Sequence, residues 1–128
     1  MSLDFLVVDS SPAVRRMIHR TLRMGDMQTN RVLEASDAPE ALNLLDNHYV
    51  DGIIAEWDAW LDQETRLVIW LASDEVMHEI PTITLLTDDR PATIESVTNQ
   101  NITDLLVKPF QPEELYAKVK QVGPYESA

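Results

Sequence analysis

Short apolar runs alternate along the chain with stretches in which apolar residues recur at helical spacing. Five runs rich in Val, Ile and Leu predict β-strands, at residues 3–8, 31–34, 50–55, 81–87 and 102–107. Between them, intervals of three and four residues predict helices over 12–22, 39–45, 61–72 with a continuation into 73–79, 91–97 and 112–122. Serine, aspartate and proline stand where most of these helices would begin, as expected for N-terminal caps.

Five strands alternating with five helices favour one α/β domain, a three-layer sandwich with a parallel sheet and right-handed crossovers. In such sheets, chemistry gathers beyond the carboxyl ends of the strands, where strand order reverses. That rule directs attention to Asp9-Ser10, Glu56, Leu86-Thr87 and Lys108, which all follow or end a predicted strand.

The chain has 128 residues, which suits a single domain. We expect the domain to span residues 1–122 and read residues 123–128 as a tail or the start of a linker. The sequence has no cysteine, which excludes disulfides, thiolate zinc sites and cysteine nucleophiles. No apolar run approaches the length of a membrane span and no signal-peptide pattern is present, so the expected location is the cytoplasm.

The formal charge of −12 argues against direct binding of nucleic acid or of an anionic membrane. The charge is uneven, because residues 1–23 hold four arginines and two aspartates. Arg16, Arg20 and Arg23 lie on one face of the first predicted helix. This face is either a solvated surface or a docking site for an acidic protein partner.

Five segments, in this order and at these spacings, resemble the receiver domain of bacterial response regulators. They are LVVDSSPAVRRMI, EASDAPEAL, DGIIAEW, PTITLLT and LLVKPF. The resemblance spans about residues 5–122 and implies a flavodoxin-like (βα)5 fold. It also implies a pocket in which an aspartate ending the third strand accepts a phosphoryl group from a histidine kinase. In that family Mg²⁺ and a lysine before a cis proline neutralise the charge that develops during transfer.

Carried over residue by residue, the resemblance places Glu56 at the phosphoacceptor position. Asp9 matches the first acid after strand one, but the second acidic position is Ser10. Asp58 stands where the main-chain carbonyl ligand of the metal would come. Lys108 and Pro109 match the lysine-proline pair, and Glu56 is expected to pair with Lys108.

The hydroxyl position of the phosphoryl pocket is ambiguous. Counting without gaps places Leu86 where the family has Ser or Thr, with Thr87 one residue late. A one-residue slip turns a strand side chain to the other face, and a bulge at the strand end would be needed to bring Thr87 round. In the family, the position three residues before the lysine often holds an aromatic residue. In this sequence it holds Leu105.

These departures predict a degenerate receiver. Serine in place of a metal-ligating acid lowers Mg²⁺ affinity, so no cofactor is expected to be required and Mg²⁺ binding is weak. Glutamate moves the carboxylate outward by about 1 Å, a displacement that can lower a reaction rate about a hundredfold. Three roles for Glu56 stay open: an imitation of phosphoaspartate, a relic, or a true phosphoacceptor.

The leading hypothesis is a signalling module that acts by protein contact, without enzymatic activity beyond a residual autophosphatase. Its expected partners are a histidine kinase, a phosphotransferase, an output domain or a second copy of the chain. The alternative is an active receiver that is phosphorylated at an atypical site with Mg²⁺. An unrelated α/β enzyme or nucleotide binder has little support, since three glycines form neither a Walker A loop nor a dinucleotide fingerprint.

Overall fold

The computed structural model describes residues 2–122 and contains one parallel sheet of five strands. The strands run in the order β2-β1-β3-β4-β5, and they span Thr29–Ala35 (β2), Leu3–Val8 (β1), Gly52–Glu56 (β3), Thr82–Leu86 (β4) and Asp104–Val107 (β5). The flavodoxin-like (βα)5 prediction is therefore confirmed, and each predicted strand is present within two residues at either end. Residues 123–128, predicted to be a tail, lie outside the described part.

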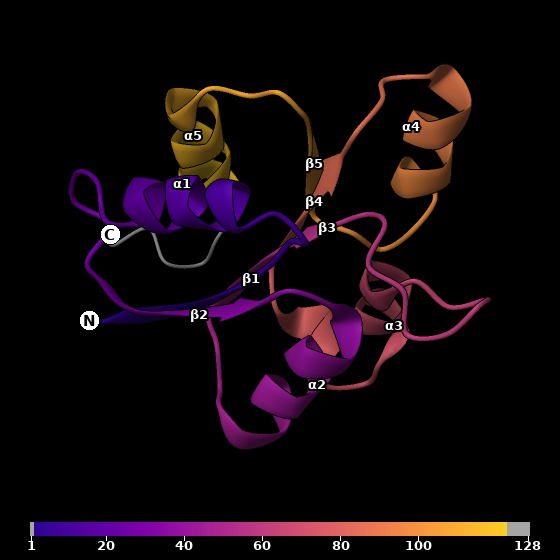
Figure 1. The fold of residues 1–128 in the computed structure, drawn as a ribbon, viewed down its shortest axis with the longest axis horizontal. Helices are drawn as coiled ribbons and strands as arrows, with labels where there is room; N and C mark the ends of the chain where they lie inside the picture. The colour runs from indigo at the N-terminus through magenta and orange to yellow at the C-terminus, as the bar shows by residue number, and fades with distance from the viewer. Residues whose placement is uncertain (1, 123–128) are drawn as a thin grey trace.

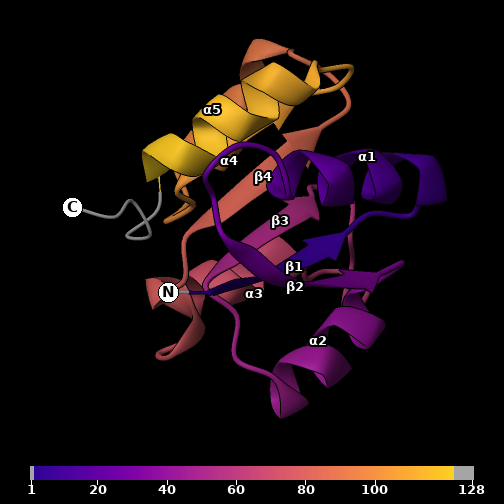
Figure 2. The same ribbon diagram turned by 90° about the vertical axis from the view of Figure 1, so that its left-hand side faces the viewer.

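Helices cover both faces of the sheet, which gives the three layers seen in Figures 1 and 2. On one face lie α1 (Pro12–Leu22) and α5 (Pro112–Val122); on the other lie α2 (Ala38–Asn47), α3 (Leu67–Ser73) and α4 (Pro91–Thr98). No helix of residues 2–122 has the length and apolar character needed to cross a bilayer.

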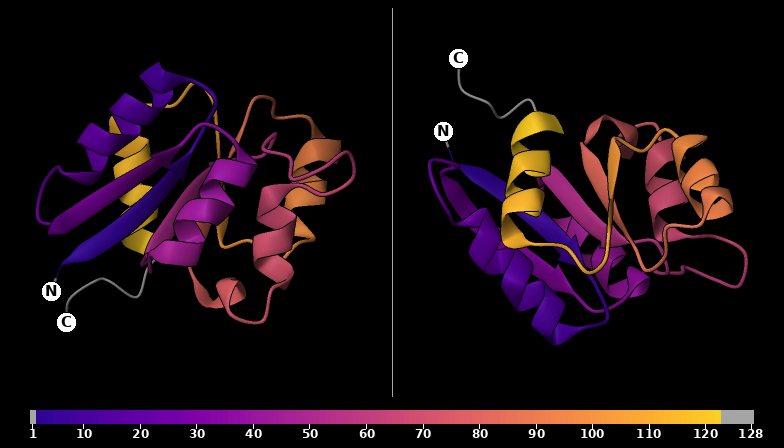
Figure 3. Two further views of the ribbon diagram at one scale, coloured as in Figure 1. Left: turned by 60° about the horizontal axis from the view of Figure 1, so that its bottom comes forward. Right: turned by 90° about the horizontal axis from the view of Figure 1, so that it is seen from above.

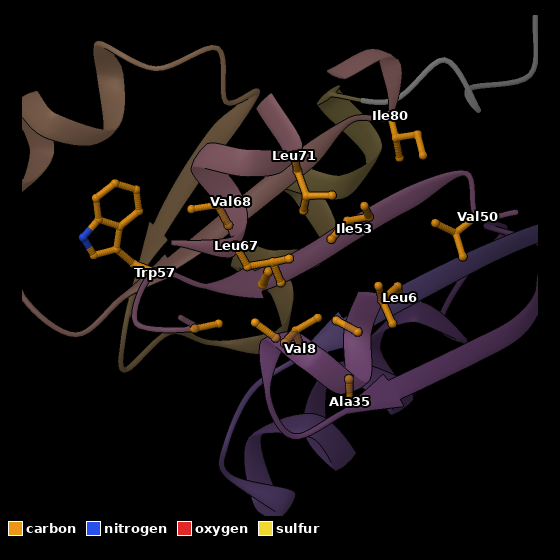
Figure 4. Packing of buried hydrophobic residues seen from close by; sticks show 14 of the residues in the cluster. Leu6, Val8, Ala35, Val50, Ile53, Trp57, Leu67, Val68, Leu71 and Ile80 are labelled. Atoms are coloured by element: carbon orange, nitrogen blue, oxygen red, sulfur yellow. The ribbon is translucent and has the colours of Figure 1, made fainter. Parts of the chain in front are cut away.

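Alternate residues of the central strands supply two separate cores. Phe5 and Val7 face α1 and α5, whereas Leu6 and Val8 pack toward α2 and α3. Figure 4 shows the second core, in which Ile53 lies among leucines of α3. A central strand covered on both faces must be apolar at consecutive positions, which accounts for the unbroken runs in the sequence.

The caps of the first two helices follow from the sequence. Ser11 is the N-cap of α1, and its hydroxyl accepts a hydrogen bond from the Val14 N–H at 3.2 Å. Asp37 caps α2 in the same way, through the Glu40 N–H at 2.9 Å. Both caps precede proline-containing first turns, as the serine and aspartate positions predicted.

The predicted third helix is wrong in its first two turns and in its continuation. Residues 57–66 form a loop, α3 begins only at Leu67, and a short 3₁₀ helix at Met77–Glu79 follows its end. Asp62 accepts hydrogen bonds from the N–H groups of Glu64 and Thr65, both at 2.8 Å. Such side-chain to backbone bonds compete with a helix, so the apolar spacing of Leu61 did not decide the local structure.

Candidate functional site

The first acid after β1 is the most deeply buried charged group of the site. Asp9 is fully buried. Its Oδ1 accepts a hydrogen bond from the Ser11 N–H at 2.9 Å, and its main-chain oxygen accepts one from Arg15 Nη1 at 2.6 Å. The other carboxylate oxygen, Oδ2, accepts no hydrogen bond and lies 2.7 Å from Lys108 Nζ. The ion pair with Lys108 is thus the only partner of Oδ2 among the described residues.

The acid that ends β3 has a different partner from the one predicted. Glu56 is half-buried, and its Oε2 accepts a hydrogen bond from the Ser10 backbone N–H. Within residues 2–122, the ammonium of Lys108 is paired with Asp9 and not with Glu56, so the predicted Glu56-Lys108 pair is wrong. A fully buried carboxylate has lost its hydration and needs the ammonium more than a half-buried one does.

Lys108 is fixed in place by the end of β5. The Lys108–Pro109 peptide bond is cis, as the lysine-proline match implied. The Lys108 N–H donates to the Leu86 carbonyl at 2.7 Å, which ties the end of β5 to the end of β4. The backbone therefore directs this lysine toward the same edge of the sheet as Asp9 and Glu56.

The register of β4 resolves the ambiguous hydroxyl position. Glu56 pairs with Leu85 across β3 and β4, and Leu86 pairs with Val107 across β4 and β5, without a shift along either ladder. Leu86 is the last residue of β4 and is fully buried in the core that contacts α3. Thr87 follows the strand and is exposed. The bulge needed to bring Thr87 round is absent from these strands, so Leu86 holds the position.

A residue that the sequence did not single out, Arg66, organises the loop after Glu56. Its Nη1 donates to the Trp57 carbonyl at 2.8 Å and to Asp58 Oδ1 at 2.9 Å. Its guanidinium lies 4.4 Å from the centre of the Trp57 ring and 4.2 Å from that of Trp60. We call these four residues the Arg66 clamp. Two tryptophans that precede the arginine in the same loop were the only sequence signal for the clamp, and a loop contact has no fixed spacing.

Comparison with known proteins places this geometry in a family. The family model described as "Response regulator receiver domain" matches residues 5–120. The chain belongs to the response regulator receiver family. Receiver domains of two-component systems interact with histidine kinases and with output partners, so the coarse functional prediction is confirmed.

Chemotaxis proteins are among the relatives of this receiver. It is 34% identical over 122 residues to Chemotaxis protein CheY1 of Helicobacter pylori, a match that covers 94% of this chain and 96% of that protein. It is 31% identical to a Chemotaxis protein CheY homolog of Campylobacter jejuni, covering 94% and 92% of the two chains. The structure of chemotaxis response regulator CheY4 of Vibrio cholerae superposes with a TM-score of 0.81 at 27% identity, over 95% of this chain and 99% of that one.

The donor set of this receiver matches only part of the magnesium site that the family resemblance implies. Asp9 and Glu56 bring two carboxylates to the edge of the sheet, while Ser10 contributes its backbone N–H to Glu56. Lys108 already pairs with Asp9, and Arg66 pairs with the side chain of Asp58, a residue for which the predicted metal ligand is the main-chain carbonyl. No group of three or more His, Asp or Glu side chains suited to a metal occurs within residues 2–122.

The basic face of α1 is only partly available to a partner. Arg16 and Arg20 are exposed and, with His19, line a shallow groove of about 270 Å³. Arg23 instead donates to the backbone carbonyls of Thr29 and Asn30, at 3.3 and 3.0 Å. All three predicted arginines are therefore exposed, and Arg23 alone among them also holds the start of β2 through its guanidinium.

Proposed function

We propose that this receiver domain signals by protein contact, with its pocket charges held permanently and phosphorylation at Glu56 lost or impaired. The observation that carries the proposal is the Asp9-Lys108 ion pair of 2.7 Å, in which Asp9 is fully buried. In the phosphorylated state of an active receiver, the lysine must face the incoming phosphoryl group. Here it would first have to leave a buried carboxylate whose Oδ2 has no other partner within residues 2–122.

The hydrogen bond and the side-chain length of Glu56 support the same proposal. Its carboxylate accepts the Ser10 N–H and extends one methylene further than the aspartate that the family uses. Phosphoryl transfer depends on in-line geometry, and a shift of about 1 Å lowers the rate about a hundredfold. The glutamate provides one fixed negative charge at this position, compared with about two for phosphoaspartate. If that charge imitates phosphorylation, Glu56→Ala should alter partner binding or oligomeric state; if it is a relic, both should stay unchanged.

Two further features argue against efficient transfer. A buried leucine at the hydroxyl position cannot donate a hydrogen bond to a phosphoryl oxygen. Two carboxylates beside an ammonium form a poor site for Mg²⁺, which prefers octahedral oxygen ligands. We therefore propose that the domain needs no cofactor, binds Mg²⁺ weakly if at all, and has no enzymatic role.

The proposed partners are proteins of a two-component pathway in the cytoplasm: a histidine kinase, a phosphotransferase, an output domain or a second copy of this chain. Arg16 and Arg20 on α1 offer a cationic contact to an acidic partner. The surrounding charge of −12 disfavours nucleic acid and anionic membranes at long range.

The experiment exposes the chain and its Glu56→Gln variant to acetyl phosphate and Mg²⁺ and measures intact mass. The proposal predicts unmodified protein in both samples. A gain of one phosphoryl mass in the wild-type chain, absent from Glu56→Gln, would overturn it and establish the alternative, an active receiver that uses Glu56.

A further inference from the structure

A polar groove of about 460 Å³ lies between α3 and α4, and the proposed function makes no use of it. Both panels of Figure 3 show these two helices beside each other, at the end of the molecule away from α1. The groove is lined by three apolar and five polar residues: Trp57, Ile69, Ala92, Arg66, Arg90, Thr93, Ser96 and Gln100. Its volume lies in the range of about 300–1,000 Å³ that small-molecule sites occupy. We propose that this groove binds a small organic anion with two or more negative charges.

The charges of the lining carry the choice of an anion. Both charged residues are arginines, and no aspartate or glutamate of the described residues lines the groove, although the chain holds 22 acidic residues against 10 basic ones. Among the uncharged polar side chains, the Ser96 hydroxyl already donates to the Ala92 carbonyl at 3.0 Å and the Thr93 hydroxyl hydrogen-bonds to Asp88, whereas the Gln100 amide keeps hydrogens to donate. Guanidinium groups bind carboxylate and phosphate oxygens in pairs of parallel hydrogen bonds.

The arginines keep donors for a ligand. Arg66 makes both of its hydrogen bonds through Nη1, so its Nε and Nη2 donate to no group in residues 2–122. Arg90 uses Nε and Nη2 on Asp88, each at 3.2 Å, and retains Nη1. Figure 4 shows the Trp57 ring pointing away from the other core side chains, with its nitrogen at the outer edge. The indole N–H is a further donor, beside the guanidinium and amide groups.

One side of the groove is organised before any ligand arrives. The guanidinium of Arg66 lies about 4 Å from each of two indole rings and is bonded to the Trp57 carbonyl. A donor that is already held in place loses less conformational entropy when it binds. Arg90, by contrast, has a side chain that is 77% exposed and pairs with Asp88 at the surface through Nε and Nη2, so it offers its remaining donor, Nη1, to a ligand.

This inference does not rest on the proposed role of Glu56. The two sites adjoin, because Trp57 lines the groove and directly follows Glu56 in the chain. Phosphoryl uptake and anion binding are measured in separate experiments, so either proposal can fail while the other stands.

Tryptophan fluorescence tests the site, since Trp57 would contact the ligand. The chain is titrated with glucose 6-phosphate and with citrate at constant ionic strength, with glucose as the neutral control. A saturable change with both anions supports a general polyanion site, a change with the sugar phosphate alone assigns phosphate esters, and one with citrate alone assigns polycarboxylates. No saturable change with either anion, or an equal change with glucose, would overturn the proposal.

Two variants with the same change in charge locate the site. Arg90→Gln removes a lining guanidinium that is largely exposed and pairs with Asp88, so the fold should persist. Arg20→Gln removes an exposed arginine of α1 that does not line this groove. Loss of a charged hydrogen bond should weaken binding about tenfold in Arg90→Gln, with less than about a twofold effect in Arg20→Gln. Equal weakening by the two variants would show a general charge effect and contradict the site.

Discussion

Two ion pairs at the same edge of the sheet have nearly the same length and very different surroundings. Lys108 Nζ lies 2.7 Å from Asp9, and Arg66 Nη1 lies 2.9 Å from Asp58. The Asp9 side chain is fully buried, whereas that of Asp58 is 52% exposed. Distance alone would rank the pairs as equals, and burial separates them. A buried charge that loses its partner destabilises a protein far more than an exposed one does.

The cations of the two pairs are also held differently. In the described part of the chain Lys108 is the only partner of Asp9 Oδ2, so that contact depends on charge. Arg66 has a carbonyl and two indole rings in addition to its acid. Removal of the acid Asp58 should therefore change the stability of the protein little. Removal of the cation, Arg66 in one pair or Lys108 in the other, should lower the stability in both cases.

The largest expected effect is that of Lys108→Met, which leaves Asp9 buried and unpaired. We expect a loss of about 3 kcal/mol in the free energy of unfolding, measured by urea denaturation. The double variant Asp9→Asn with Lys108→Met should recover much of that loss, because the uncompensated charge is gone. A loss under about 1 kcal/mol in Lys108→Met would contradict the importance of burial.

Adjacent residues at the end of β4 allow the same contrast between buried and exposed positions without charge. Leu86→Thr removes a fully buried leucine and places a hydroxyl in the core, so it should cost about 2–4 kcal/mol of stability. Thr87→Val, at the exposed next position, should change stability by less than about 0.5 kcal/mol. Thermal unfolding of the two variants checks the assignment, and a reversed order would show that Thr87 and not Leu86 is the buried residue at this strand end.

The Arg66 clamp should show an intermediate effect. Arg66→Met keeps an apolar stem but loses the guanidinium over both rings and the bond to the Trp57 carbonyl, so about 1–2 kcal/mol should be lost. Hydrogen exchange should become faster in residues 57–66. The matched variant Asp58→Asn should cost less than about 1 kcal/mol, as an exposed pair does. Equal losses in the two variants would make the acid, and not the stacking, the source of the stability.

The smallest effect concerns a partly exposed acid beside the groove, Asp88. Hydrogen bonds from the Arg90 side chain and backbone N–H lower the pKa of Asp88 from 3.8 to about 2. The carboxylate should therefore stay mostly ionised as the pH falls through 3.8, and the pair with Arg90 should be lost as the pH falls through about 2, where half of the Asp88 carboxyl groups are protonated. In Arg90→Gln the Asp88 pKa should rise toward 3.8, as followed by carboxyl carbon NMR. An unchanged pKa would exclude Arg90 as its main cause.

Much of the fold could be predicted because the strands are buried on both faces. Unbroken apolar runs such as that of β1 are typical of a central strand with helices on either side, and Ser11 and Asp37 mark helix starts by a local mechanism. The prediction of the third helix failed at Leu61 because the side chains of Asp62 and Arg66 form hydrogen bonds with nearby backbone groups. Apolar periodicity does not reveal such bonds.

The site was predicted less completely than the fold. Strand ends place Asp9, Glu56 and Lys108 at one edge, since all parallel strands present their carboxyl ends together. Which acid receives the lysine depends on burial, a tertiary property that sequence order does not contain. The position of Leu86 followed from ungapped counting, but only the continuous strand register decided it against Thr87.

Phosphoryl uptake, compared with that of a restored pocket, decides whether the pocket of this receiver has lost its phosphoacceptor function. The wild-type chain and the variant Ser10→Asp, Glu56→Asp, Leu86→Thr are incubated with acetyl phosphate and Mg²⁺ under identical conditions, and intact mass is followed over time. In the restored variant three carboxylates, Asp9 among them, can hold Mg²⁺, and the metal then replaces Lys108 as the countercharge of Asp9 and frees the lysine for the phosphoryl group. We therefore expect the restored variant to gain one phosphoryl group and the wild-type chain to gain none. Uptake by the wild-type chain as fast as by the restored variant would contradict a pocket with permanently held charges.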